Sequence, residues 1–139
     1  MRNKMKRFEN AALILYNAFN KGTLDQNDGC ACVVGNLLEH EEWKGSYNCT
    51  RNNIFVHQGA RNSVEFCGEG KNTSDYTIEE LSNIEKIFLN SFVGLRIKEE
   101  KSKDNQYNAL MNVLEYLAEL DRITIPEVTI DNFKSVLTN

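Results

Sequence analysis

Residues 104–121 read DNQYNALMNVLEYLAELD, and this stretch decides the fold. Its apolar side chains recur at the three- and four-residue spacing that lines one face of an α-helix, at Leu110, Val113, Leu114, Leu117 and Leu120. This is the cleanest amphipathic pattern in the chain. We therefore expect a helix that begins with Asp104 as its N-cap and lies at the centre of a hydrophobic core.

A second helix is predicted near the N-terminus, from about residue 5 to residue 20. Its apolar stripe repeats at i, i+4, i+7 and i+11 and consists of Phe8, Ala12, Leu15 and Phe19. Gly22 stands where a left-handed C-terminal cap is needed, because glycine adopts positive φ without steric cost.

Two more helices are predicted from residues that favour the start of a helix. Thr77-Ile78-Glu79-Glu80 is a capping box, and the stripe that follows it is Leu81, Ile84, Phe88 and Phe92, with Gly94 expected at the helix end. After Pro126, Thr129 is predicted to cap a last helix, whose inward residues would be Ile130, Phe133 and Leu137.

The middle of the chain loses helical periodicity. A short apolar helix is expected around Ala31, Val34, Leu37 and Leu38, and residues 43–75 are then rich in Gly, Asn and Ser. Residues 54–56 and 64–66 would suit a short β-hairpin within this segment. We therefore predict a mostly α fold: one helical domain over residues 1–139, a bundle of four or five helices with 43–75 as a loop-rich or hairpin insertion.

Length and charge exclude several classes of function. With 139 residues, 41% hydrophobic and 26% charged, the chain fits one folded domain and is too short for a TIM barrel of about 250 residues. A net charge of −4 provides no overall positive field for nucleic acid. No convincing signal peptide or membrane span is seen, so we expect a cytoplasmic protein whose thiols stay reduced. The sequence leaves open whether the protein forms a homo-oligomer.

Cysteines suggest two alternative functions. Cys30 and Cys32, with further cysteines and histidines downstream, supply ligands for a zinc-stabilised domain. However, side chains at i and i+2 of a helix point about 200° apart, so both thiols reach one ion only if Cys30 precedes the first turn. Cys32 with His57 or His40 would instead make a cysteine-dependent hydrolase or transferase, although no oxyanion loop accompanies them.

Glu85 lies inside an apolar stripe, where a carboxylate must find a hydrogen-bond donor or take up a proton. The alternative is that it lies at the edge of the stripe and reaches water. We interpret it as part of a small polar pocket between the helical bundle and residues 43–75. The predicted ligand-binding residues are Cys32, Asn36, Trp43, His57, Gln58 and Glu85. The resulting hypothesis is a non-catalytic binding or interaction module for a small molecule or a protein, with no bound cofactor.

These same segments resemble a family of short, uncharacterised bacterial proteins, some of which carry an automatic label as a component of the sodium-translocating NADH:quinone reductase. The similarity runs in order through most of the chain, at residues 21–24, 32–36, 43–44, 56–58, 76–89 and 104–110. In the family a first cysteine falls at the position of Gly29, whereas this chain has Cys30. The reductase label does not fit, because the iron–sulfur spacing and the length of a flavin and NADH domain are both missing. The resemblance implies no established function.

Overall fold

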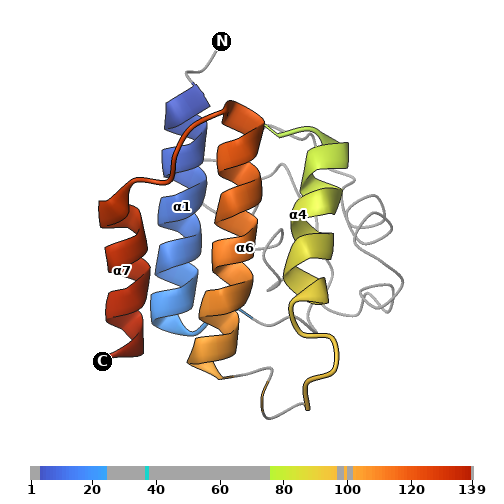
Figure 1. Ribbon diagram of the computed structural model, residues 1–139, viewed down its shortest axis with the longest axis vertical. Helices are drawn as coiled ribbons and strands as arrows, with labels where there is room; N and C mark the ends of the chain where they lie inside the picture. The colour runs from blue at the N-terminus through green and yellow to red at the C-terminus, as the bar shows by residue number, and fades with distance from the viewer. Residues whose placement is uncertain (1–3, 25–36, 38–75, 97–98, 100–101, 139) are drawn as a thin grey trace. The chain divides into compact units, whose positions relative to one another are not determined.

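The computed structural model describes residues 4–24, 37, 76–96, 99 and 102–138. Four helices lie in these ranges: α1 (Lys4–Lys21), α4 (Ile78–Asn90), α6 (Lys103–Asp121) and α7 (Glu127–Leu137) (Figure 1). Because no strand occurs within these ranges, the mostly α prediction is confirmed for this part of the chain. The predicted hairpin and the 43–75 insertion lie outside it, and of the short helix expected near residue 34 only Leu37 lies inside, helical and buried.

The chain divides into two compact units. The first consists of Met1–Thr23 with Ile87–Asn139, and the second of Leu24–Lys86, so the boundary falls within α4. In the first unit, α1, α6 and α7 pack against one another in pairs. Figure 1 shows α1 and α7 running in the same direction, with α6 antiparallel to both.

The apolar stripes form the core of the first unit, as predicted. On α1 the residues Phe8, Ala12, Leu15 and Phe19 are all buried. On α6 the fully buried side chains are Leu110, Val113, Leu114 and Leu117, whereas Leu120 is half-buried. Helix α6 contacts both α1 and α7 and its stripe is buried, so its predicted place in the core is confirmed, although α1 and α7 likewise each contact the other two helices.

A buried ion pair joins the first helix to the end of α6. The Arg7 guanidinium donates from Nε to both carboxylate oxygens of Asp121, at 3.0 and 3.2 Å, and from Nη2 to Oδ1 at 2.6 Å. The Asp121 side chain is 0% exposed and that of Arg7 only 16%. This forked arrangement is the charge-assisted geometry that best offsets the cost of burying a carboxylate.

The start of α6 differs from the prediction. Ser102, not Asp104, is the N-cap: its backbone is extended and its hydroxyl accepts a hydrogen bond from the Asn105 amide at 3.1 Å. Asp104 is the second residue of the helix, where its negative charge complements the helix dipole. Serine and aspartate are both favoured as N-caps, so the sequence pattern did not separate them.

The start of α7 also differs. Pro126 is the N-cap, and its carbonyl already accepts from the amides of Thr129 at 3.0 Å and Ile130 at 3.3 Å. The predicted cap, Thr129, therefore lies in the first turn of a helix that begins at Glu127. The buried face differs accordingly: Phe133 and Val136 are buried, whereas Ile130 and Leu137 are half-buried.

The capping box of α4 is confirmed. The Thr77 hydroxyl accepts from the Glu80 amide at 3.0 Å, and Oε1 of Glu80 accepts from the Thr77 amide at 2.9 Å. The predicted stripe is buried at Leu81, Ile84, Phe88 and Phe92. The α-helix ends at Asn90, and tighter turns then continue to Gly94, whose φ is +86°. The helix is thus shorter than the glycine position indicates.

Helices α1 and α6 end in the same way with different residues. After α1, Gly22 has φ +71°, and the Thr23 amide donates to the Ala18 carbonyl at 2.9 Å. After α6, Arg122 has φ +55°, and the Ile123 amide donates to Ala118 at 3.0 Å. Both are Schellman caps, and only Arg122 has a Cβ in the left-handed region.

Replacing Arg122 with glycine is therefore expected to raise the free energy of unfolding by about 0.5–1 kcal/mol, because the left-handed strain is removed. The matched change Gly22→Ala is expected to lower it by about 1 kcal/mol. A Cβ at Gly22 meets no atom within 4 Å, so that cost is purely conformational. Urea denaturation of both variants tests the pair. A loss of stability in Arg122→Gly would show that the side chain contributes more than its strain costs.

Candidate functional site

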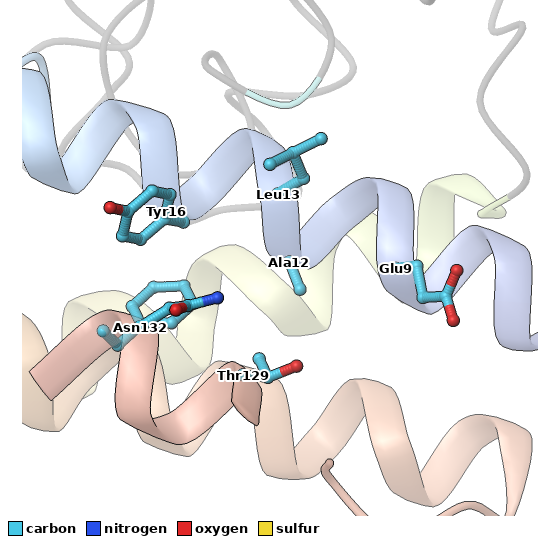
Figure 2. Close-up of a pocket in the computed structure, with 7 residues that line it drawn as sticks. Glu9, Ala12, Leu13, Tyr16, Thr129 and Asn132 are labelled. Carbon is cyan, nitrogen blue, oxygen red and sulfur yellow. The ribbon is translucent and has the colours of Figure 1, made fainter. Parts of the chain in front are cut away.

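A groove lies between α1 and α7, within the first unit (Figure 2). Its volume is about 130 Å³. From α1 it is lined by Glu9, Ala12, Leu13 and Tyr16, and from α7 by Thr129, Asn132 and Phe133. These residues follow helical spacing, i, i+3, i+4 and i+7 on α1 and i, i+3 and i+4 on α7, so one face of each helix makes one wall.

The inner part of the groove is apolar and tightly held. Phe133 is fully buried, and its ring centroid lies 5.8 Å from that of Tyr16 in an edge-to-face arrangement, with 74° between the planes. Phe133 also stacks on Phe19, with a centroid distance of 6.1 Å and 20° between the planes. Because aromatic pairs at these distances stabilise one ring orientation, the apolar wall is preformed.

The outer part of the groove is polar. Glu9, Thr129 and Asn132 present a carboxylate, a hydroxyl and an amide, and Figure 2 shows Asn132 on α7 across from Tyr16 on α1. Glu9 is exposed and has the only formal charge among the seven lining residues. Within the described part of the chain, no ion pair joins Glu9 to a lysine or arginine. The groove therefore has a net negative charge.

The two helices that form the groove also carry exposed apolar side chains. Leu13 lines it and is 56% exposed, and Val128, four residues before Asn132 on α7, is 64% exposed. An apolar wall with a few polar groups and an exposed apolar rim is typical of a binding site.

Most of the predicted ligand-binding residues lie outside the described ranges: Cys32, Asn36, Trp43, His57 and Gln58. Glu85 lies on α4, in the second unit, and is 1% exposed. The alternative that Glu85 reaches water at the edge of the stripe is therefore wrong. Its role in a ligand pocket stays a prediction.

The zinc and cysteine-enzyme alternatives also stay predictions. All four cysteines and both histidines lie outside the described ranges. Among residues inside those ranges, no group of three or more histidine, cysteine, aspartate or glutamate side chains is arranged to hold a metal ion.

Sequence reasoning did not find the groove between α1 and α7. Its residues come from two helices far apart in the chain, and no local sequence pattern predicts which helices pack against each other. One signal was present: Leu13 is a large apolar residue beside, not within, the stripe of Phe8, Ala12, Leu15 and Phe19. An apolar residue next to a stripe either widens the buried face or stays exposed on a binding surface.

No protein-family model, curated protein or solved structure matches this chain. The resemblance to short bacterial proteins therefore stays a prediction, and the candidate site depends on its own geometry. In the described helices, no segment is long and apolar enough to cross a membrane.

Proposed function

We propose that this chain is a non-catalytic, cytosolic interaction module that binds a segment of a partner protein in the groove between α1 and α7. The site is distinct from the pocket that the sequence predicts against residues 43–75. The observation that supports the proposal is a preformed apolar wall, Tyr16 with Phe133, that opens onto exposed Leu13 and is bounded by polar side chains.

The chemistry of the lining favours binding over catalysis. The seven lining residues offer one carboxylate, two hydroxyls and one amide, and they include no imidazole, thiol or amine. Activated nucleophiles need an adjacent base or a depressed pKa, and among the described residues that line the groove no imidazole or amine accompanies the Thr129 and Tyr16 hydroxyls.

A protein segment fits better than a small molecule. A compact ligand that fills the groove would contact Leu13, which lines it, but would leave the exposed apolar surface of Val128 in water. A peptide that places one side chain in the groove and apolar neighbours over Leu13 and Val128 would cover the groove and both exposed side chains. The apolar area removed from water stabilises such a complex by about 25 cal/mol per Å² before ordering costs.

Matched tryptophan substitutions test the proposal. The probe is a fluorescein-labelled, capped pentapeptide with one lysine between two leucines, titrated with the full chain and followed by fluorescence anisotropy. Asn132→Trp places a large ring at the groove and is expected to weaken binding about tenfold or more. Lys134→Trp, at an exposed position of α7 outside the groove lining, is expected to bind like the unmodified chain.

Circular dichroism of both variants confirms that α7 still folds. Equal binding by Asn132→Trp and Lys134→Trp would overturn the assignment of the groove, and so would an anisotropy that never rises with the unmodified chain.

A further inference from the structure

We propose that the linker between α6 and α7, residues 122–126, is a second interaction surface, which binds an extended, basic segment of a partner protein as an added β-strand. This surface is separate from the groove between α1 and α7, since the two share no lining residue. Three features of the linker support the proposal: its extended backbone, its unused hydrogen-bonding groups and the negative charge beside it.

The linker has the composition and the exposure pattern of a strand. Its residues Ile123, Thr124 and Ile125 are β-branched. Pro126 disfavours the helical conformation for the residue before it and is itself extended, with φ −60° and ψ 138°. Residues 123–126 lie in neither a helix nor a turn. Ile123 and Ile125 are half-buried whereas Thr124 is exposed, which is the alternation expected when successive side chains point to opposite faces.

Most backbone hydrogen-bonding groups of this stretch are unused. The Ile123 amide donates to the Ala118 carbonyl at 3.0 Å, as part of the cap of α6. Among the residues that the structure describes, no hydrogen bond is made by the amides of Thr124 and Ile125 or by the carbonyls of residues 123–125. In an extended chain the N–H and C=O of Thr124 point to the side opposite those of Ile123, and so away from the α6 cap. This backbone therefore presents an edge on which another strand can pair.

A groove of about 340 Å³ accompanies this edge. It is lined by Glu115, Ala118 and Glu119 on one face of α6, and by Ile123 and Ile125 on one face of the linker. Side chains of a segment paired with the linker would alternate in direction, so every second one would lie over the groove. The two isoleucines offer apolar contact to the stems of those side chains.

The charge of the groove favours a basic segment. Glu115 and Glu119 are exposed, carry the only formal charges among the five lining residues and form no ion pair within the described ranges. Like charges four residues apart on a helix repel each other, so a cation beside them relieves this repulsion. Glu119 also lies in the last turn of α6, which contains no basic residue to offset the negative end of the helix dipole. Lysine or arginine over the groove gains from both effects.

The same charge argues against a second copy of the chain as the occupant. Two linkers have matching sequences for antiparallel pairing, because residues 123–125 read Ile-Thr-Ile in both directions. Such a pair would bring Glu115 and Glu119 of both copies to the same face, with four carboxylates and no cation among the groove residues. A basic partner segment meets no such repulsion.

Fluorescence anisotropy of the full chain with a labelled, capped pentapeptide that alternates valine with lysine (the alternating peptide) tests the proposal. Two N-methylated forms keep every side chain but lose backbone donors, one at the central valine and the other at both lysines. Because N–H groups of an extended chain point alternately to opposite sides, one form is expected to bind roughly five- to tenfold more weakly and the other like the unmethylated peptide. Equal binding of all three peptides, or an equal loss in both methylated forms, would overturn β-strand addition.

Paired substitutions test the choice of a basic segment. Glu115→Gln with Glu119→Gln is expected to weaken binding of the alternating peptide about three- to tenfold. The matched control, Asp104→Asn with Asp131→Asn, removes the same charge from exposed positions outside the groove lining and is expected to leave the affinity nearly unchanged. An equal loss in both double variants would overturn the groove as the site of the basic side chains.

Amide hydrogen exchange identifies the occupant. The Thr124 amide, which has no acceptor in the part of the chain that the structure describes, is expected to exchange rapidly in the free chain and at least tenfold more slowly with saturating alternating peptide. A Thr124 amide that is protected without peptide, in a chain that sediments as a dimer, would identify a second copy as the occupant and overturn the proposal.

Asn132→Trp separates the two surfaces, because Asn132 lines only the groove between α1 and α7. The substitution is expected to weaken the pentapeptide with one lysine between two leucines (the lysine peptide) and to leave binding of the alternating peptide unchanged. If it weakened both peptides equally, both would bind between α1 and α7, and the linker would not be an interaction surface.

Discussion

Replacing Leu117 with alanine is expected to lower the free energy of unfolding by about 2–5 kcal/mol. Leu117 is fully buried on α6, the helix that contacts both α1 and α7. Removing three carbon atoms there loses their transfer free energy and leaves a cavity, because close-packed neighbours relax only in part. Urea denaturation followed by circular dichroism measures the loss.

Leu13→Ala is the matched control, since it removes the same atoms from a residue that is 56% exposed. Its expected effect on stability is about 0.5 kcal/mol or less. If Leu117→Ala cost no more than Leu13→Ala, the stripe of α6 would not be part of the core, and the fold of the first unit would be wrong.

Asp121→Ala is expected to lower the free energy of unfolding by about 3 kcal/mol. The change leaves the Arg7 guanidinium, which is mostly buried, without the carboxylate to which it now donates three hydrogen bonds. Most of the loss arises because a buried guanidinium loses its paired carboxylate, whereas the intact pair gains little over an apolar replacement. The double substitution Arg7→Leu with Asp121→Leu should therefore recover much of it.

The exposed pair Arg96 and Glu99 is the control for this effect. Their charged groups are 3.9 Å apart, and the side chains of Arg96 and Glu99 are 88% and 48% exposed. Glu99→Ala is expected to change stability by about 0.5 kcal/mol or less. A comparable loss in Glu99→Ala and Asp121→Ala would show that burial does not determine the strength of the Arg7–Asp121 pair.

Helix periodicity and the capping box were predictable because they depend on residues within one or two turns. The stripe of α6 and the Thr77–Glu80 box are confirmed for this reason. Boundaries were less predictable where two residues of similar chemistry compete, as Ser102 and Asp104 do. The left-handed Arg122 had no sequence signal, since arginine rarely takes that conformation and is held there by the cap hydrogen bonds.

The candidate site was not predictable from the sequence, because it depends on which helices pair. Glu85 was singled out correctly as an acid within a buried stripe. In contrast, the sequence pattern does not distinguish Glu9 and Asn132 from other solvated residues of their helices. Their place in one groove follows only from the pairing of α1 with α7, which brings Asn132 across from Tyr16 and puts Glu9 in the lining at the other end (Figure 2).

The most direct test of the groove is a methyl NMR titration of the full chain with the lysine peptide. Ala12 and Leu13 line the groove, whereas Val93, which is 77% exposed in the turns after α4, is an exposed apolar residue outside it. We predict saturable shifts of the Ala12 and Leu13 methyl signals and an unmoved Val93. Equal shifts at all three residues, or shifts at Val93 alone, would contradict binding between α1 and α7.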